Sequence, residues 1–269
     1  MTTSRSMQAT GHKETVVVKV GGSIMSQLPS SFIDSIATMA EDYHVVIVHG
    51  GGPEINGMLE KLGIRSTFIN GQRKTTDEVF EVAEQMLKGK VNGDLTHRFN
   101  HSGVKAVGVC GYDSRLLLAE FLDEGVLGRV GKVVKVQADL LEDLLSSGYV
   151  PVVTPLAVTS DGVKVNVNAD LGASAIAAGL GAERLLLVTD VPGILKDGDL
   201  IRETTVEGIH SLVEDGTIYG GMIPKVEAAV STLGSGMKEV MIVGGKGSLY
   251  EEGKIVGTKI IQAGGVNRL

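Results

Sequence analysis

Residues 45–54 read VVIVHGGGPE. The run begins with β-branched apolar residues, which are typical of a strand covered on both faces. A glycine run then makes a tight turn, and Pro53 stands where proline favours the first turn of a helix. A strand that passes through a short turn into a helix is half of a βαβ unit. This stretch therefore predicts a parallel sheet with helices packed against it.

The same alternation of strand and helix extends along the chain. Further buried strands are predicted at residues 16–20, 106–109, 150–153, 185–188 and 240–243. Apolar residues at every third and fourth position predict helices at residues 32–40, 55–62, 79–86, 140–145, 176–180, 206–213 and 226–233. Alternating polarity around turn residues predicts hairpins at the rim of the sheet, at residues 116–136, 157–167 and 194–202. The fold class is therefore α/β, with a mainly parallel central sheet.

No low-complexity linker divides the chain, so two lobes would share one sheet. The boundary is expected at the helix after Asp170, with an N-terminal lobe at residues 15–181 and a C-terminal lobe at residues 182–269. A polar lead at residues 1–14 lacks the apolar core of a signal peptide.

Composition excludes several classes of protein. The chain has 269 residues, of which 43% are hydrophobic and 21% charged, a globular balance that excludes wholesale disorder. Its formal net charge of −7 argues against a general binder of nucleic acid or anionic membranes. The single cysteine, Cys110, excludes an internal disulfide and a cysteine-based zinc site. No run reaches the ~20 apolar residues that span a bilayer. We expect a cytoplasmic location.

Two glycine loops follow predicted strands and are candidate anion sites. In residues 16–23, VVVKVGGS, the strand delivers Lys19 just before two glycines whose amides are accessible, which is the chemistry of a phosphate cradle. In residues 45–54 the amides at the helix N-terminus favour a carboxylate or phosphate, whereas a plain turn needs only one glycine. Neither loop is a Walker A motif or a G-x-G-x-x-G fingerprint, which disfavours a dehydrogenase.

His49 is a weak candidate for catalysis. A lone histidine beside a buried strand is more often a hydrogen-bonded core residue. The six histidines show no metal-ligand spacing, so no dedicated protein metal site is expected.

Several motifs together make the chain similar to the amino-acid kinase family along nearly its whole length. They occupy residues 19–23, 49–53, 70–75, 166–170, 190–195 and 220–225. The resemblance implies a three-layer αβα sandwich and a homodimer, for which the helix at residues 79–86 is a candidate contact. It also implies transfer of phosphate from ATP, carrying Mg²⁺, to the γ-carboxylate of N-acetyl-L-glutamate in arginine biosynthesis.

The resemblance also implies roles for individual residues. Lys19 and Lys225 would hold the nucleotide phosphates and neutralise the transferring group, and Asp170 would orient both lysines. Residues matching the acyl-substrate contacts are Gly51, Gly52, Arg73 and Asn166. Residues matching the nucleotide site are Gly21, Gly22, Asp190, Val191, Pro192, Gly193, Ile194, Leu195, Thr217, Ile218 and Tyr219.

The implied chemistry is consistent with these residue types. A γ-carboxylate with a pKa near ~4.3 is already ionised at neutral pH, so it needs no general base. The difficulty is that two anions must meet, and catalysis must therefore rest on positioning and charge neutralisation. Each residue also has a simpler reading: Lys19 as a solvated strand lysine, Arg73 as a loop charge, Asp170 as a helix cap, or Lys225 as an exposed cation in a first helical turn.

Two departures from the family pattern and two alternative functions stay open. Lys74 stands where relatives often have an apolar residue, and Ser114 stands where glycine is common. The alternatives are a sister carboxylate kinase, acting on aminoadipate or glutamate linked to a carrier protein, and a non-catalytic amino-acid sensor on the same fold. An acidic carrier would need a basic surface, which the net charge of −7 disfavours.

Overall fold

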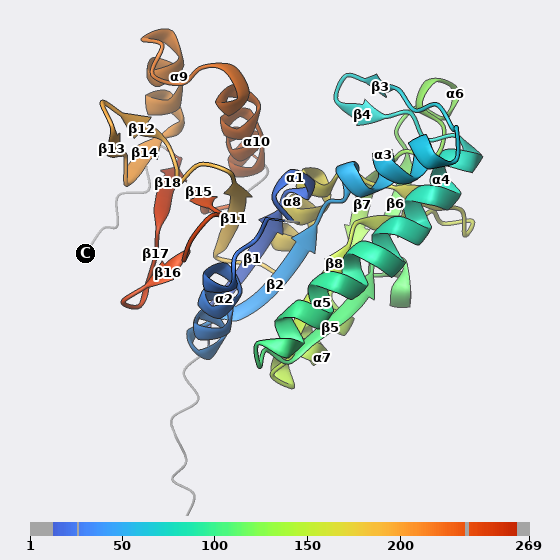
Figure 1. Cartoon of the computed structure of the whole chain (residues 1–269), viewed down its shortest axis with the longest axis horizontal. Helices are drawn as coiled ribbons and strands as arrows, with labels where there is room; N and C mark the ends of the chain where they lie inside the picture. Colours follow the sequence, from blue (N-terminus) through green and yellow to red (C-terminus); the bar gives the residue numbers. More distant parts are fainter. Residues whose placement is uncertain (1–12, 26, 235–236, 263–269) are drawn as a thin grey trace, which may run out of the picture.

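The computed structural model describes residues 13–25, 27–234 and 237–262 (Figure 1). Most of the polar lead expected at residues 1–14 thus lies outside the described residues. The chain forms an eight-stranded sheet in the order β14-β18-β15-β11-β1-β2-β8-β5. Its strands are β1 (Thr15–Val20), β2 (His44–His49), β5 (Ala106–Cys110), β8 (Val150–Thr154), β11 (Arg184–Thr189), β14 (Glu203–Thr205), β15 (Glu239–Gly244) and β18 (Gly257–Ile261).

The strands from β15 to β5 in this order are mutually parallel, as the sequence predicted. β18 pairs antiparallel with β15, and β14 pairs parallel with β18. These two strands, at one end of the sheet, were not expected. Figure 1 shows β1 and β2 in the middle of the molecule, with α9 and α10 on one side of them and α3 and α4 on the other.

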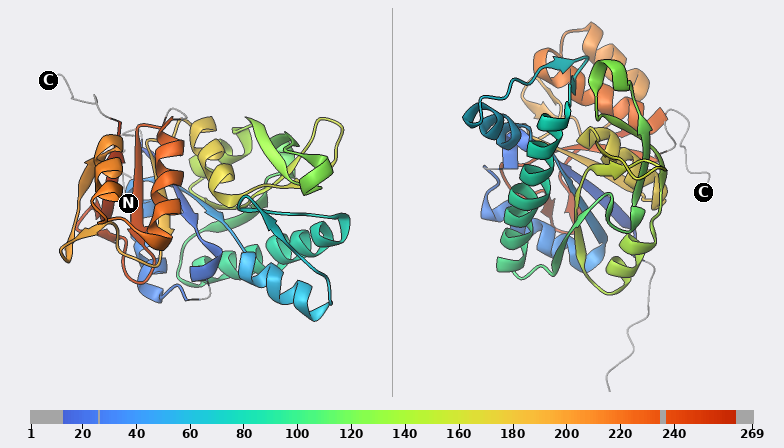
Figure 2. Two further views of the ribbon diagram at one scale, coloured as in Figure 1. Left: turned by 90° about the horizontal axis from the view of Figure 1, so that it is seen from above. Right: turned by 90° about the vertical axis from the view of Figure 1, so that its right-hand side faces the viewer.

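Helices cover both faces of the sheet (Figure 2). Alternate residues of a strand point to opposite faces, so Val16 and Val18 pack with α2 (Ser30–Asp42) and α5 (Asn92–His101). Val17 packs on the other face. The helices of that face are α7 (Asp139–Ser146), α8 (Ala169–Gly179), α9 (Val206–Glu214) and α10 (Ile223–Gly234). This confirms a three-layer sandwich and explains why the strands are apolar at nearly every position.

The helix predicted at residues 79–86 is part of a longer helical run. α4 (Asp77–Glu84) continues through a π-helical segment, η1 (Gln85–Val91), directly into α5. The sequence pattern missed α5 because glycine and asparagine lower helix propensity around residues 89–93. The apolar side chains of α4 pack inside the chain against α3 (Gly52–Lys61). The dimer contact expected at residues 79–86 stays a prediction.

The expected hairpins form, but their placement at the rim of the main sheet was wrong. β6 (Leu117–Phe121) pairs antiparallel with β7 (Gly131–Val136), and β9 (Leu156–Val158) with β10 (Lys164–Asn166). Together they make a separate sheet in the order β10-β9-β6-β7. Pro155 lies between β8 and β9 and has no amide hydrogen to donate. The chain leaves the main sheet at this residue.

The remaining elements are short. They are α1 (Gly22–Met25), β3 (Phe68–Ile69), β4 (Gln72–Arg73), the 3₁₀ turn η2 (Asp113–Arg115), α6 (Glu124–Leu127), β12 (Leu195–Lys196), β13 (Asp199–Leu200), the 3₁₀ turn η3 (Gly220–Met222), β16 (Tyr250–Glu251) and β17 (Lys254–Ile255). Because β1, β2, β8 and β11 are parallel, the loops after them meet at one edge of the sheet, where open α/β sheets bind ligands. Within the described ranges, no helix is long and apolar enough to cross a bilayer.

Candidate active site

Three adjoining cavities lie along the carboxyl edge of the sheet. One cavity, of about 290 Å³, is bounded by the loop after β2 and the β3–β4 hairpin. We call it the acyl cavity, after the role that the family resemblance implies for its lining residues. The central cavity, of about 220 Å³, shares Lys19 and Asp170 with the acyl cavity. The outer cavity, of about 340 Å³, shares Asp190, Gly221 and Lys225 with the central cavity. The two lysines thus stand at the two junctions of one continuous groove.

Lys19 projects from the central strand β1 towards the start of α8. Its Nζ lies 2.9 Å from Asp170 Oδ1, and its side chain is only 14% exposed. β1 lies between β11 and β2, so Lys19 is not a lysine at a solvated sheet edge. Asp170 does not cap α8, since Asn168 Oδ1 accepts the hydrogen bonds from the first amides of that helix. The Asp170 carboxylate is therefore available to the lysine.

Lys225 lies in the first turn of α10 and pairs with a different carboxylate. Its Nζ lies 2.5 Å from Oδ1 of Asp190, the residue that follows β11. The hydrogen bond from Lys225 holds the pKa of Asp190 below its usual value. We had expected Asp170 to orient both lysines, whereas the structure gives each lysine its own aspartate. Both ion pairs line the central cavity, and a contact of Asp170 with Lys225 stays a prediction.

Arg73 is the cation of the acyl cavity. It is 6% exposed, so the reading as a solvated loop charge does not hold. Arg73 Nη1 donates to Ser66 Oγ at 2.8 Å, and Nη2 donates to the carbonyl oxygen of Gly52 at 3.4 Å. The guanidinium carbon lies 4.6 Å from the centre of the Phe68 ring. Burial lowers the pKa of Arg73, yet a guanidinium remains charged at neutral pH.

The other expected acyl-site residues also line this cavity. They are Gly51, Gly52 and Asn166. Asn166 Nδ2 donates to Thr75 Oγ1 at 3.4 Å, which ties β10 to the segment after Arg73. Lining residues that the sequence analysis missed include Phe68, Leu87 and Pro155. They are apolar and far apart in the chain, so no local motif marks them.

Most of the expected nucleotide-site residues meet in the outer cavity. They are Asp190, Val191, Gly193, Ile194, Leu195, Thr217, Ile218 and Tyr219. Tyr219 is 75% exposed, an open aromatic face beside the cavity. Gly21 lines the central cavity and Gly22 the acyl cavity. Pro192 instead packs against Gly244, whose absent Cβ would lie 3.0 Å from the Pro192 Cα.

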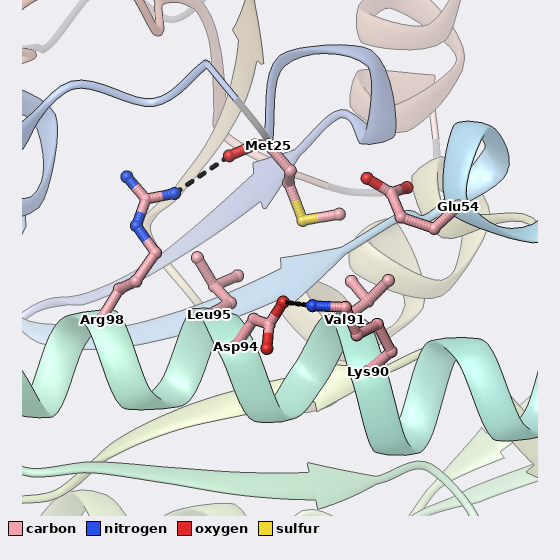
Figure 3. Close-up of a pocket in the computed structure, with 7 residues that line it drawn as sticks. All are labelled: Met25, Glu54, Lys90, Val91, Asp94, Leu95 and Arg98. Atoms are coloured by element: carbon pink, nitrogen blue, oxygen red, sulfur yellow. Dashed lines mark hydrogen bonds and ion pairs between the residues drawn. The ribbon is translucent and has the colours of Figure 1, made fainter. Parts of the chain in front are cut away.

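A fourth cavity, of about 300 Å³, lies behind the glycine loops between α1, α3 and α5 (Figure 3). Arg98 reaches from α5 and donates from Nη1 to the Met25 carbonyl oxygen at 3.0 Å, and also to Leu28 O. Lys90 pairs with Asp94, while the buried Oε2 of Glu54 has no partner among the described residues. Arg98 thus ties the end of α1 to the helical layer.

His49 is a hydrogen-bonded core residue, as predicted. It ends β2 and is fully buried. Burial lowers the pKa of His49 to about 4, so the ring is neutral at pH 7.

The sequence model of the Amino acid kinase family matches residues 14–244, and the chain belongs to this family. The chain is 52% identical over 254 residues to the acetylglutamate kinase of Geobacillus kaustophilus, covering 94% of this chain and 98% of that protein. It is 51% identical to the acetylglutamate kinase of Geobacillus thermodenitrificans over 92% of this chain and 96% of that protein. Among solved structures, smu.665 from Streptococcus mutans UA159 matches with a TM-score of 0.78 and 29% identity, covering 92% and 98% of the two chains.

Proposed function

We propose that this protein transfers the γ-phosphoryl group of ATP to the γ-carboxylate of N-acetyl-L-glutamate, a step of arginine biosynthesis. The observation that carries the proposal is the placement of Lys19 and Lys225 at the two junctions of one groove. One end of that groove has a buried arginine, and the other has an open aromatic wall. Relatives about half identical over nearly the whole chain, each named acetylglutamate kinase, support this choice of substrate.

The reaction needs charge neutralisation and no proton transfer. A γ-carboxylate oxygen attacks the γ-phosphorus, and the bond from that phosphorus to the β,γ-bridging oxygen breaks. The products are N-acetyl-L-glutamyl 5-phosphate and ADP, and the electron pair stays on the departing ADP oxygen. Lys19 would face the incoming carboxylate and Lys225 the phosphates of the nucleotide. Preorganised positive charge of this kind stabilises the transition state more strongly in a partly closed cleft than it would in water.

Arg73 would hold the α-carboxylate of the acyl substrate. A guanidinium presents two parallel N–H groups that match a carboxylate, whereas an ammonium is a point charge. Ser66 and the Phe68 ring hold the guanidinium in place before substrate arrives. The amides of Gly51 and Gly52 and the side chain of Asn166 would complete the acyl site.

ATP would occupy the outer and central cavities. We propose that its base lies against Tyr219, Ile194 and Leu195 and that its phosphates reach Lys225 and the Gly21–Gly22 amides. Mg²⁺ would arrive on the phosphates. The carboxylates of Asp170 and Asp190 line the central cavity, and oxygen ligands beside phosphates suit this ion. Bound Mg²⁺ would neutralise phosphate charge.

We also propose residues 15–181 as the acyl-binding lobe, residues 182–269 as the nucleotide-binding lobe, a cytoplasmic location and a homodimer. The acyl cavity is lined wholly by residues of the first range, and the outer cavity wholly by residues of the second. The lone buried Cys110 suits a reducing compartment. The family resemblance supports the homodimer, and sedimentation velocity would test it.

Trapping the acyl phosphate with hydroxylamine tests the reaction. The purified chain is offered ATP with N-acetyl-L-glutamate, glutamate, aspartate or carbamate in turn. We expect hydroxamate only with N-acetyl-L-glutamate. Turnover only of a carrier-linked substrate would support the sister kinase, and absence of ADP with every acceptor would support a sensor.

Lys225→Ala tests the charge mechanism. Loss of one preorganised cation should lower kcat by about 10²-fold or more. Lys105→Ala, at an exposed lysine just before β5 and outside the three cavities, is the matched control. A near-normal kcat in Lys225→Ala would refute the role of this lysine.

A further inference from the structure

The orientation of one peptide in the glycine loop depends on His49. The ring nitrogen Nδ1 of His49 lies 2.8 Å from the carbonyl oxygen of Gly50. The other nitrogen, Nε2, lies 3.0 Å from Asn92 Nδ2 and 3.0 Å from Thr154 Oγ1. The imidazole therefore joins α5 and β8 to the start of the loop.

The partners of the ring determine its tautomer. Asn92 Nδ2 also lies 2.8 Å from the carbonyl oxygen of Val152, which can only accept. This amide group must therefore be the nitrogen, and it donates to His49 Nε2 as well. Nε2 accepts, so the proton of the neutral ring lies on Nδ1 and is donated to Gly50 O. Gly108 leaves room for this arrangement, because a Cβ there would lie 2.0 Å from Asn92 Oδ1.

The hydrogen bond to Gly50 O sets the direction of the next amide. In a trans peptide the carbonyl and the following N–H lie in one plane and point in opposite directions. No described peptide bond is cis. With Gly50 O held towards the buried ring, the N–H of Gly51 points away from it, and Gly51 lines the acyl cavity.

The backbone nitrogens of Gly51 and Gly52 both lie close to Gly22. A Cβ on Gly22 would lie 3.0 Å from Gly51 N and 2.9 Å from Gly52 N. Only glycine at position 22 allows the first residue of α1 to approach these two nitrogens so closely. The contact lies where α1 meets the start of α3. Gly51 and Gly52 also line the acyl cavity, where the proposed function places an anionic oxygen of the substrate.

We infer that His49 is a positioning residue, whose Nδ1 hydrogen bond to Gly50 O aims the Gly51 amide at an anionic oxygen of the acyl substrate. The inference rests on the proposed function, since that function supplies the oxygen. His49 itself is buried beneath the loop and touches no reacting atom in this arrangement. This role adds to its place in the core, because it acts through the direction of one peptide.

Two variants of His49 separate these roles. Asn carries an amide nitrogen at nearly the position of Nδ1 and can keep the donor to Gly50 O. Gln places its amide near Nε2 and keeps the contacts with Asn92 and Thr154 while losing that donor. We expect His49→Gln to lower kcat about 10- to 100-fold, the scale for a misdirected catalytic contact. His49→Asn should retain most of the turnover, and the KM for ATP should change little in either variant.

Thr154→Val is the matched control. It removes another hydrogen bond of the same network and leaves Asn92 to hold Nε2 as an acceptor. We expect it to lower the unfolding temperature as His49→Gln does, with kcat within about twofold of the unmodified chain. If kcat follows the unfolding temperature through all three variants, His49 is only a core residue.

Long-range ¹H–¹⁵N NMR of the full labelled chain reads the tautomer without any activity. We expect a protonated Nδ1 and an unprotonated Nε2. A ring protonated on Nε2, or an unchanged kcat in His49→Gln, overturns the role of His49. An unmodified chain without turnover of N-acetyl-L-glutamate refutes the proposed function, which is a separate result.

Discussion

Single residues in the acyl cavity combine charge with close packing. Arg73 is surrounded by Ser66, Gly52 and Phe68 rather than by solvent. A cation held in this way loses little conformational freedom when a carboxylate binds. The guanidinium of Arg73 therefore favours binding through its fixed orientation as well as through its charge.

Arg73→Ala should weaken binding of the acyl substrate. Loss of a buried charged pair costs about 3 kcal/mol, so the KM for N-acetyl-L-glutamate should rise about 10²-fold. Arg73→Lys should recover little of this, because an ammonium lacks the paired N–H groups. Steady-state kinetics with each substrate varied in turn makes the measurement.

The neighbouring lysine provides the control for Arg73. Lys74 is exposed and lies outside the lining of the acyl cavity. Lys74→Ala should leave both KM values within about twofold, since exposed charges contribute little. A rise in the KM for ATP alone in Arg73→Ala would overturn the assignment.

Ser114 stands where the family pattern favours glycine, and its backbone shows why. Its φ is 50° and its ψ 20°, the left-handed region that costs a non-glycine residue about 1–2 kcal/mol. Glycine would remove this cost and would lose part of the gain through a freer unfolded chain. Ser114→Gly should therefore raise the free energy of unfolding by about 0.5–1 kcal/mol, measured by urea titration. Ser147→Gly is the control, because Ser147 has a φ of −84° and should gain nothing.

At the scale of elements, contacts at both of its ends fix the short helix α1 in place. Gly22, its first residue, contacts the amides of the second glycine loop, and Met25, its last, accepts a hydrogen bond from Arg98 (Figure 3). A short helix with few contacts of its own depends on such ties. The long α4–η1–α5 run thus supports one side of the loop after β1, which we propose to bind phosphate, from outside the groove.

Arg98→Met should loosen α1. Two carbonyl oxygens lose a charged donor, so the free energy of unfolding should fall by about 2 kcal/mol. The KM for ATP should rise several-fold. The Gly21 and Gly22 amides, which we propose to bind the ATP phosphates, lie at the start of α1 and would move with it. Arg98→Lys should restore part of both effects, and Arg115→Met at an exposed arginine should change neither. An unchanged KM for ATP in a destabilised Arg98→Met would show that α1 does not influence the nucleotide.

At the scale of the whole molecule, stability should depend on pH through His49. Burial lowers its pKa to about 4, from 6.5 in the unfolded chain. Between these values the unfolded chain binds more protons, so stability rises with pH and is lost on acidification. Between pH 7 and pH 5 the loss from this group is about 2 kcal/mol.

Urea unfolding at the two pH values measures this effect. The unmodified chain should lose about 2 kcal/mol more than His49→Asn, since asparagine does not titrate. Equal losses in the two chains would place the acid sensitivity elsewhere.

Local pattern alone predicted the α/β class, the parallel strands and the two glycine loops. Strand and helix periodicities are properties of neighbouring residues, and so is the requirement for glycine and proline in a tight turn. The same local reading predicted the hairpins at residues 116–136 and 157–167, and it indicated that His49 belongs to the core.

Only the tertiary structure decided which distant groups meet. It paired Lys225 with Asp190, buried Arg73 against Ser66 and Phe68, and set Asn92 and Thr154 around His49. It also moved the hairpins into a second sheet. These contacts depend on strand order and helix packing, which bring together segments that no short-range pattern relates. The amino-acid sequence thus determined the elements and the chemistry available, whereas the packing of the sheet determined the partners.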